Sequence, residues 1–125
     1  MKPGDYSEVS RVFSKVDIEA YSALSAHTVA GEQVPEPLVG ALFSYLLGVK
    51  LPGLGTNYLK QETRFLLTAT IGDELKARVE ITRIRPDKHL VDLATTCHRS
   101  NGDVIANGRA LVYIGDLMQQ TANDS

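Results

Sequence analysis

The segment from Leu38 to Leu47 constrains the fold of this chain more than any other feature of its sequence. Its residues place apolar side chains all the way round a helix, and Pro35 or Pro37 can occupy the first turn, where a missing N–H costs nothing. Gly48 can end this helix, and Pro52-Gly53 prevents its continuation. A helix without a polar face must be surrounded by protein. The sequence therefore predicts a central helix that is covered on every side.

The C-terminal half of the chain has the alternating pattern of β-strands. From Glu74 to Ile84 apolar and polar residues alternate strictly, which is typical of a strand with one buried and one wet face. A turn at Arg85–Lys88 leads to a second alternating strand from Val91 to His98, with Cys97 on the inward face. Ser100–Asp103 contains Asn-Gly, a hairpin signal, and a last strand follows from Val104 to Ile114.

The remaining segments supply a less regular strand and a short N-terminal unit. The strand runs from Asn57 to Thr68, and Tyr6 to Ser14 fits a short strand. Asp17 is the expected N-cap of a short helix whose apolar face is formed by Ile18, Tyr21 and Leu24. A buried helix followed by an antiparallel meander of about four long strands predicts an α+β domain in which a curved sheet wraps the helix.

Composition and charge narrow the class of protein further. The chain has 125 residues and a formal net charge of −2, so we expect one domain over 1–118 and a polar tail over 119–125. Without a basic excess, neither a nucleic acid nor an anionic membrane is an expected partner. The apolar stretch Leu38–Leu51 is too short to cross a bilayer, and no apolar core follows Met1–Asp5, so we expect a cytoplasmic protein. The single cysteine and three unpatterned histidines predict no metal site.

Three short motifs resemble one known family. They are Leu42–Gly48, the Leu-Pro-Gly-x-Gly-Thr-x-Tyr-Leu segment over Leu51–Leu59, and Ile71–Leu75 with its Gly-Asp-Glu turn. Together they are similar to the hot-dog fold, MaoC-like (R)-specific enoyl-CoA hydratase and acyl dehydratase family. The similarity covers about Tyr6 to Ile114.

This resemblance implies a fold, a partner and a substrate class. The central helix would be wrapped by a curved antiparallel sheet, and two subunits would pair their sheets as a homodimer or as a heterodimer with another hot-dog chain. The substrate would be an acyl thioester of coenzyme A or acyl carrier protein, whose pantetheine arm takes the place of a separate cofactor. Backbone N–H groups at the helix start would polarise the thioester carbonyl. Because Pro35 has no N–H, these donors are expected to shift into the helix, toward Val39 and Gly40.

The connector before the helix departs from the family pattern. The usual Asp-x-Asn-Pro-x-His motif is missing from Ala26–Glu36, and Pro35-Glu36 stands in place of the usual His-Gly. His27 has an ordinary pKa of about 6.5, which suits general acid–base chemistry, and Glu36 or Glu32 is the candidate carboxylate partner. The alternatives are a solvated loop histidine and a first-turn glutamate that merely complements the helix dipole.

Three functions are consistent with this altered connector. The first is a hydratase or dehydratase with a rebuilt site, and the second is a non-catalytic subunit that completes the site of another hot-dog chain. The third is a thioesterase or isomerase in which Glu36 or Glu32 activates water. An acyl-CoA sensor is a fourth possibility, from a different class. Asn57 and Gln61, on one strand face with Leu59 between them, are expected either to contact the pantetheine amides or to face water.

Overall fold

The computed structural model describes residues 1–25, 33–53 and 56–115. Two candidate residues, His27 and Glu32, and the tail over 119–125 lie outside this part of the chain. In chain order the elements are β1 (Tyr6–Val12), α1 (Lys15–Ser25), α2 (Glu36–Tyr45), the π-helical turn η1 (Leu46–Lys50), β2 (Thr56–Phe65), β3 (Glu74–Arg85), the 3-10 turn η2 (Pro86–Lys88), β4 (Leu90–Arg99) and β5 (Val104–Ile114).

The strands form one antiparallel sheet in the order β1-β3-β4-β5-β2. The α+β prediction is confirmed, but the predicted meander covers only β3, β4 and β5. β2 does not pair with β3, its neighbour in sequence; it lies at the far edge of the sheet beside β5, and β1 forms the opposite edge beside β3. Both edges of the sheet are thus made by the two strands that precede β3 in the chain.

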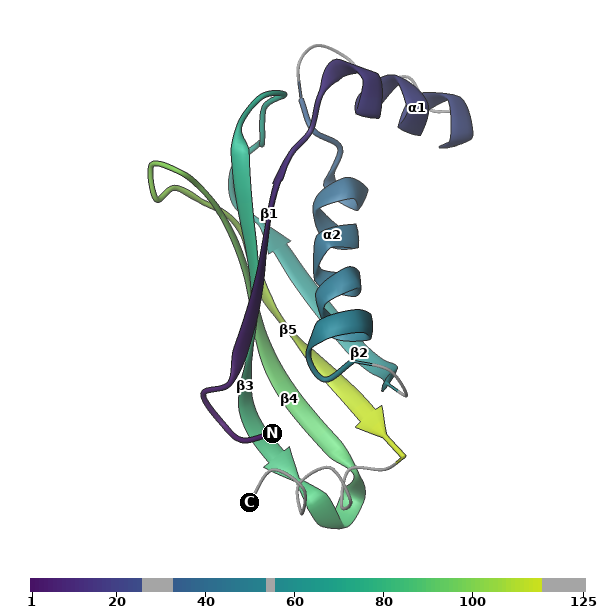
Figure 1. Cartoon of the computed structure of the whole chain (residues 1–125), viewed down its shortest axis with the longest axis vertical. Helices are drawn as coiled ribbons and strands as arrows, with labels where there is room; N and C mark the ends of the chain where they lie inside the picture. Colours follow the sequence, from purple (N-terminus) through teal and green to yellow (C-terminus); the bar gives the residue numbers. More distant parts are fainter. Residues whose placement is uncertain (26–32, 54–55, 116–125) are drawn as a thin grey trace.

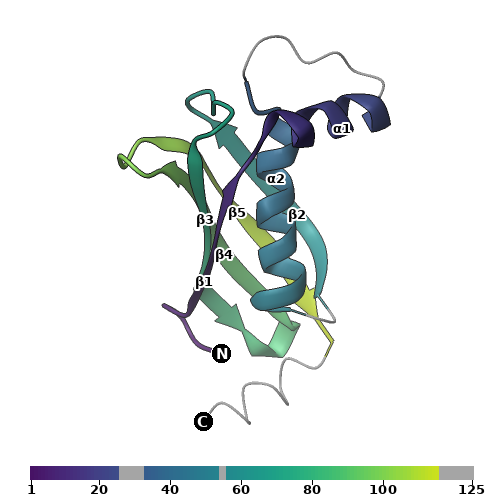
Figure 2. The same cartoon turned by 45° about the horizontal axis from the view of Figure 1, so that its top comes forward.

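The central helix lies against the concave face of this sheet. Figures 1 and 2 show α2 crossing that face, with α1 near its amino end and beyond the end of the sheet. Most inward side chains of β3, β4 and β5 are those predicted from the alternation, including Val79, Leu93 and Val112, which are fully buried. The alternation places Val104 on the same inward face as Val112, but Val104 is 39% exposed and Ile105 is buried instead, because the register shifts at the start of β5. The core thus forms between one face of the helix and one face of the sheet.

The expectation that α2 is covered on every side is not met by the described residues. Val39 and Phe43 face the sheet and are buried, as are Leu46 and Leu47 in η1. Ala41 is exposed on the other side, and Tyr45 and Val49 follow at intervals of four residues with 43% and 55% of their surface exposed. We call Ala41, Tyr45 and Val49 the open stripe of the helix.

The C-terminal end of the helix lies two residues beyond its predicted stop. The prediction that Gly48 ends it is wrong, because helical structure continues through η1 to Lys50. The backbone N–H of Leu51 donates to the Leu46 carbonyl at 2.7 Å, and that of Gly53 donates to the Leu47 carbonyl at 3.0 Å. These bonds satisfy two terminal carbonyls that would otherwise be buried without partners. No helix in the described ranges is long and apolar enough to cross a membrane.

The start of α1 is a capping box centred one turn earlier than predicted. Ser14, not Asp17, precedes the helix, and its hydroxyl accepts from the Asp17 backbone N–H at 3.2 Å. The Asp17 carboxylate accepts in return from the Ser14 backbone N–H at 2.8 Å. This reciprocal pair satisfies two donors at the helix start. The bonds from Ser14 hold the pKa of Asp17 below its ordinary value.

Candidate functional site

The start of α2 presents a single free backbone donor among the described residues. Pro35 is the N-cap, with no side-chain hydrogen bond to the helix, and Pro37 lies in the first turn. Neither proline has an N–H. The N–H of Leu38 donates to the Pro35 carbonyl at 3.0 Å. The N–H of Glu36 is therefore the first-turn donor that remains available to a ligand.

This donor lies where the helix carries a partial positive charge. A carbonyl oxygen that gains negative charge during a reaction is stabilised by such a donor if it is held in place beforehand. The Glu36 side chain is exposed beside it, so the same residue offers a carboxylate. One residue at the helix start can thus contact both an acyl carbonyl and a water molecule or proton.

The two helix residues predicted to bind substrate lie further along α2. Val39 is 1% exposed and faces the sheet, and Gly40 is half-buried. As the fourth and fifth residues of the helix, both have N–H groups that belong to the regular helical ladder. Neither residue is therefore a free donor. Gly40 has a different property: a Cβ added there would meet nothing within 4 Å.

The chain before the helix is held by the loop between β2 and β3. The backbone N–H of Val34 donates to the Ala69 carbonyl at 2.8 Å, and Gln33 forms an isolated β-bridge with Thr70. Val34 and Ala69 are both buried. The direction and position of the α2 start are therefore set by this loop, which is distant in sequence.

The register of β2 separates Asn57 from Gln61. Asn57 lies opposite Tyr113, whereas Gln61 lies opposite Ala110, and the register shifts between Tyr58 and Lys60. Directly opposed residues share a sheet face. Asn57 therefore points to the outer face with the exposed Tyr113, and Gln61 points to the helix face with the buried Ala110. The prediction of one shared face is wrong because this bulge inserts Leu59 as an extra residue.

One cavity lies away from the helix start. It has a volume of about 590 Å³ and is a dish on the β2, β5 and β4 part of the sheet, lined mainly by outward-facing residues that include Glu62, Arg64, Thr96, Asn107 and Arg109. None of the predicted site residues within the described ranges lines it. Its position on the face opposite α2 separates it from the Glu36 donor.

Two further observations concern possible metal ligands and the single cysteine in the described ranges. No group of three or more His, Cys, Asp or Glu side chains there could hold a metal ion. Cys97 is fully buried in the core, and burial raises the pKa of its thiol to about 11. A thiol in that state is a poor nucleophile.

Comparison with known proteins identifies the family. The chain is 35% identical to an (R)-specific enoyl-CoA hydratase of Aeromonas caviae, over 91% of this chain and 96% of that protein. The chain belongs to the (R)-specific enoyl-CoA hydratase family. It is also 31% identical to a protein of the same name from Rhodospirillum rubrum, over 91% of this chain and 88% of that one. No protein-family model matches the chain.

Solved structures of this family have the same fold. The (R)-hydratase of Aeromonas caviae superposes with a TM-score of 0.82 at 34% identity, covering 91% of this chain and 97% of that one. An unliganded (R)-hydratase of Pseudomonas aeruginosa superposes with the same TM-score at 27% identity. A hot-dog-like protein from Thermanaerovibrio acidaminovorans shares the fold at a TM-score of 0.62. The predicted hot-dog fold is confirmed.

The alignment with the Aeromonas hydratase shows that this chain is shorter than that protein. The alignment runs over 128 residues, but it includes only 91% of the 125 residues of this chain. This chain therefore has fewer residues than the hydratase over the aligned span. A shortened connector without the usual acid–base motif is consistent with that difference. Sequence reasoning missed the contribution of Ala69 and Thr70 to this region, because a loop residue that acts through its backbone leaves no side-chain signal.

Proposed function

We propose that this chain binds an acyl thioester at the start of α2 and interconverts an enoyl thioester with a 3-hydroxyacyl thioester. The observation that carries the proposal is the free Glu36 N–H at a helix start in a member of the (R)-specific enoyl-CoA hydratase family. The thioester carbonyl would accept from this N–H. Hydration adds hydroxide to C3 and a proton to C2, and the intervening negative charge accumulates on that carbonyl oxygen.

Acid–base chemistry would be carried by His27 with Glu36 or Glu32. In the hydration direction one of these groups takes a proton from water, and a protonated group returns a proton to C2. The structure supports this proposal only at Glu36, whose side chain is exposed at the helix start. No cofactor is required beyond the pantetheine arm of the substrate. A cytoplasmic location stays a prediction from the sequence.

A second hot-dog chain is the proposed partner. The open stripe of α2 exposes Tyr45 and Val49, and Leu59 on the edge strand β2 is 57% exposed. Exposed large apolar side chains on a helix face and on an edge strand are expected where another chain packs. The partner would be a second copy of this chain or a different hot-dog chain, and either assembly would cover the helix face that the sheet leaves open.

The missing Asp-x-Asn-Pro-x-His motif favours one alternative, a non-catalytic subunit. Such a chain would keep the thioester site and the partner interface, and the other chain would supply the acid–base groups. Binding and turnover separate the two proposals, since only binding is common to both.

The test uses the purified chain with crotonyl-CoA and a longer enoyl-CoA. The expected result for the unmodified chain is loss of the enoyl absorbance as the substrate is hydrated. If His27 and Glu36 act as acid and base, the rate of this loss should be at least about 100-fold lower in His27→Ala and in Glu36→Gln. His98→Ala is the matched control, because His98 pairs with Lys76 and alternates with the buried, inward-facing residues of β4. Binding of saturated butyryl-CoA without turnover of any enoyl-CoA would instead identify the non-catalytic subunit. Absence of both would refute the thioester site.

A further inference from the structure

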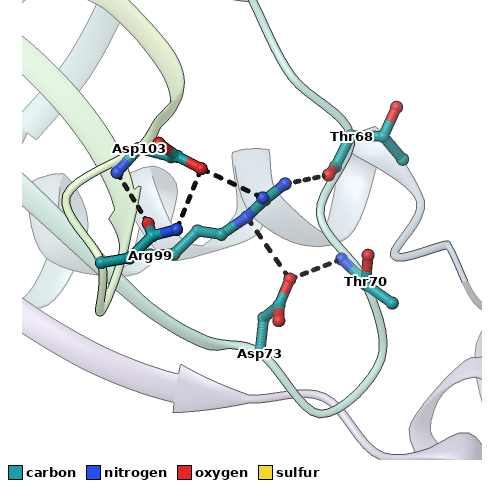
Figure 3. Close-up of polar contacts among 6 residues, drawn as sticks. Thr68, Thr70, Asp73, Arg99 and Asp103 are labelled. Carbon is teal, nitrogen blue, oxygen red and sulfur yellow. Dashed lines mark hydrogen bonds and ion pairs between the residues drawn. The ribbon is translucent and has the colours of Figure 1, made fainter.

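Arg99, the last residue of β4, spans the gap between a hairpin turn and the loop of residues 66–73 (Figure 3). Its Nη2 donates to the Thr68 carbonyl at 2.6 Å, and its Nε lies 3.4 Å from Oδ2 of Asp73. On the hairpin side its Nη1 donates to Oδ2 of Asp103 at 3.3 Å. The side chain is 24% exposed, so these contacts are only partly screened by water.

Asp73 closes the loop on itself, which makes the loop a defined turn. Its carboxylate accepts from the Thr70 backbone N–H at 3.1 Å, and its own N–H donates to the Thr70 carbonyl at 3.0 Å. Gly72 between them has a φ of +91°, which favours glycine. Arg99 therefore contacts a folded turn at two points, the Thr68 carbonyl and the Asp73 carboxylate.

The same turn holds the chain that leads into α2. Ala69, directly after Thr68, accepts the Val34 N–H at 2.8 Å, and Thr70 pairs with Gln33. Val34 precedes the N-cap of α2, and the free donor of Glu36 lies two residues beyond it. A continuous series of short polar contacts thus connects the Arg99 guanidinium to the backbone before Glu36.

We propose that Arg99 is a positioning residue for the thioester site. It acts through the 66–73 loop to fix the Glu36 N–H, and this inference rests on the proposed function of that donor. A donor that stabilises developing charge must already be in place when the charge forms, and displacement by about 1 Å can cost a factor of about 100 in rate. Loss of Arg99 therefore lowers kcat more than it weakens ground-state binding.

The geometry of the cluster requires arginine. Its Nη2 and Nη1 donate hydrogen bonds to Thr68 and Asp103, and its Nε, which makes no hydrogen bond among the described residues, lies in an ion pair with Asp73. A lysine ammonium is a point charge on a flexible stem and does not reproduce this fork. Arg99→Lys keeps the charge but is expected to lose most of the positioning, whereas Arg99→Gln loses both.

Arg85 provides a matched control at the opposite end of the β3–β4 hairpin. Its Nε and Nη2 donate to Oδ2 of Asp92 at 3.2 and 2.6 Å, and its side chain is 27% exposed, close to the value for Arg99. Neither bond reaches the 66–73 loop. Asp103→Asn is a second control, because it weakens only the hairpin side of the cluster.

The experiment measures backbone amide exchange at Val34 by NMR, together with kcat and KM for crotonyl-CoA, in Arg99→Gln, Arg99→Lys and Arg85→Gln. The Val34 amide reports directly on its bond to Ala69 and exchanges through local opening. In Arg99→Gln we expect Val34 exchange to rise about tenfold, equivalent to about 1.4 kcal/mol, and kcat to fall by a similar factor with KM within about twofold. Arg85→Gln is expected to change neither, and Arg99→Lys to behave more like Arg99→Gln than like the unmodified chain.

Two results would overturn the proposal. One is unchanged Val34 exchange in Arg99→Gln, or an equal rise in Arg85→Gln. The other is faster Val34 exchange with unchanged kcat, which would give Arg99 a structural role only. If the unmodified chain binds butyryl-CoA but turns over no enoyl-CoA, the proposed catalytic activity of this chain is wrong, but the role of Arg99 can still be tested. The shift of the Glu36 amide on binding butyryl-CoA then replaces kcat as the quantity compared between variants. If Arg99→Gln does not fold, Arg99→Lys decides the same comparison.

Discussion

Gly40 lies in the interior of α2, where glycine is unfavourable, and the space beside it is open. Glycine in a helix interior is about 1 kcal/mol less favourable than alanine. A Cβ at this position would meet no atom within 4 Å, so nothing in the described chain requires glycine. We therefore predict that Gly40→Ala increases the free energy of unfolding by about 1 kcal/mol. For a domain of this size the corresponding rise in Tm is about 3–5 °C.

The same substitution is expected to damage ligand binding. If the open space holds the acyl or pantetheine part of a thioester, an added methyl group overlaps the ligand, and overlap of this kind costs about 1–3 kcal/mol. Butyryl-CoA should then bind at least about fivefold more weakly to Gly40→Ala. Stability is measured by urea unfolding at a fixed protein concentration, and affinity by isothermal titration calorimetry.

Ala41→Gly is the matched control for this prediction. Ala41 is exposed one residue further along the helix, so its replacement should lower stability by about 1 kcal/mol and leave butyryl-CoA affinity unchanged. Increased stability of Gly40→Ala with unchanged affinity would refute the assignment of this space to the substrate. Decreased stability would refute the packing argument itself.

Three further predictions concern the core and the start of α1. Thr95 is fully buried and its Oγ1 has no hydrogen-bond partner among the described residues. Thr95→Val should therefore increase the free energy of unfolding, measured in urea, by about 1 kcal/mol. A decrease would show that the hydroxyl is bonded in solution. The buried Cys97 thiol, with its pKa raised to about 11, should resist an aromatic disulfide reagent at pH 8 until the chain is unfolded, and rapid labelling of the folded protein would contradict its placement. Ser14 lowers the pKa of Asp17 in the folded state, so the ionised carboxylate stabilises the protein above its ordinary pKa of 3.8 and loses this effect as the pH falls through the folded value. The difference in unfolding free energy between the unmodified chain and Asp17→Asn should therefore shrink between pH 6 and pH 3. A constant difference would exclude the capping box.

The parts of the fold that the sequence predicts correctly are those set by local pattern. Alternation from Glu74 to Ile84 identifies both β3 and its buried face, because successive side chains of a strand point to opposite sides. The Asn-Gly turn before Val104 similarly predicts the β4–β5 hairpin. Both features are decided by residues within a few positions of each other.

The features that the sequence does not predict are set by distant contacts. The place of β2 beside β5 depends on pairing across about 50 residues, and no local signal identifies that partner. The bulge at Leu59 moves Asn57 to the other face, which a strict period of two cannot show. The link from Arg99 to the start of α2 passes through backbone groups of Thr68 and Ala69, so it is visible only in three dimensions.

The central claim is that an acyl thioester binds with its carbonyl at the Glu36 N–H, and a titration of the ¹⁵N-labelled chain with butyryl-CoA tests it most directly. This saturated thioester cannot be hydrated, so the measurement reports binding whether or not the chain is catalytic. The account predicts a large shift of the Glu36 amide, with smaller shifts along the first turn of α2. Shifts confined to the outer-face cavity, at residues such as Ala94 and Arg109, or no shifts at all, would contradict it.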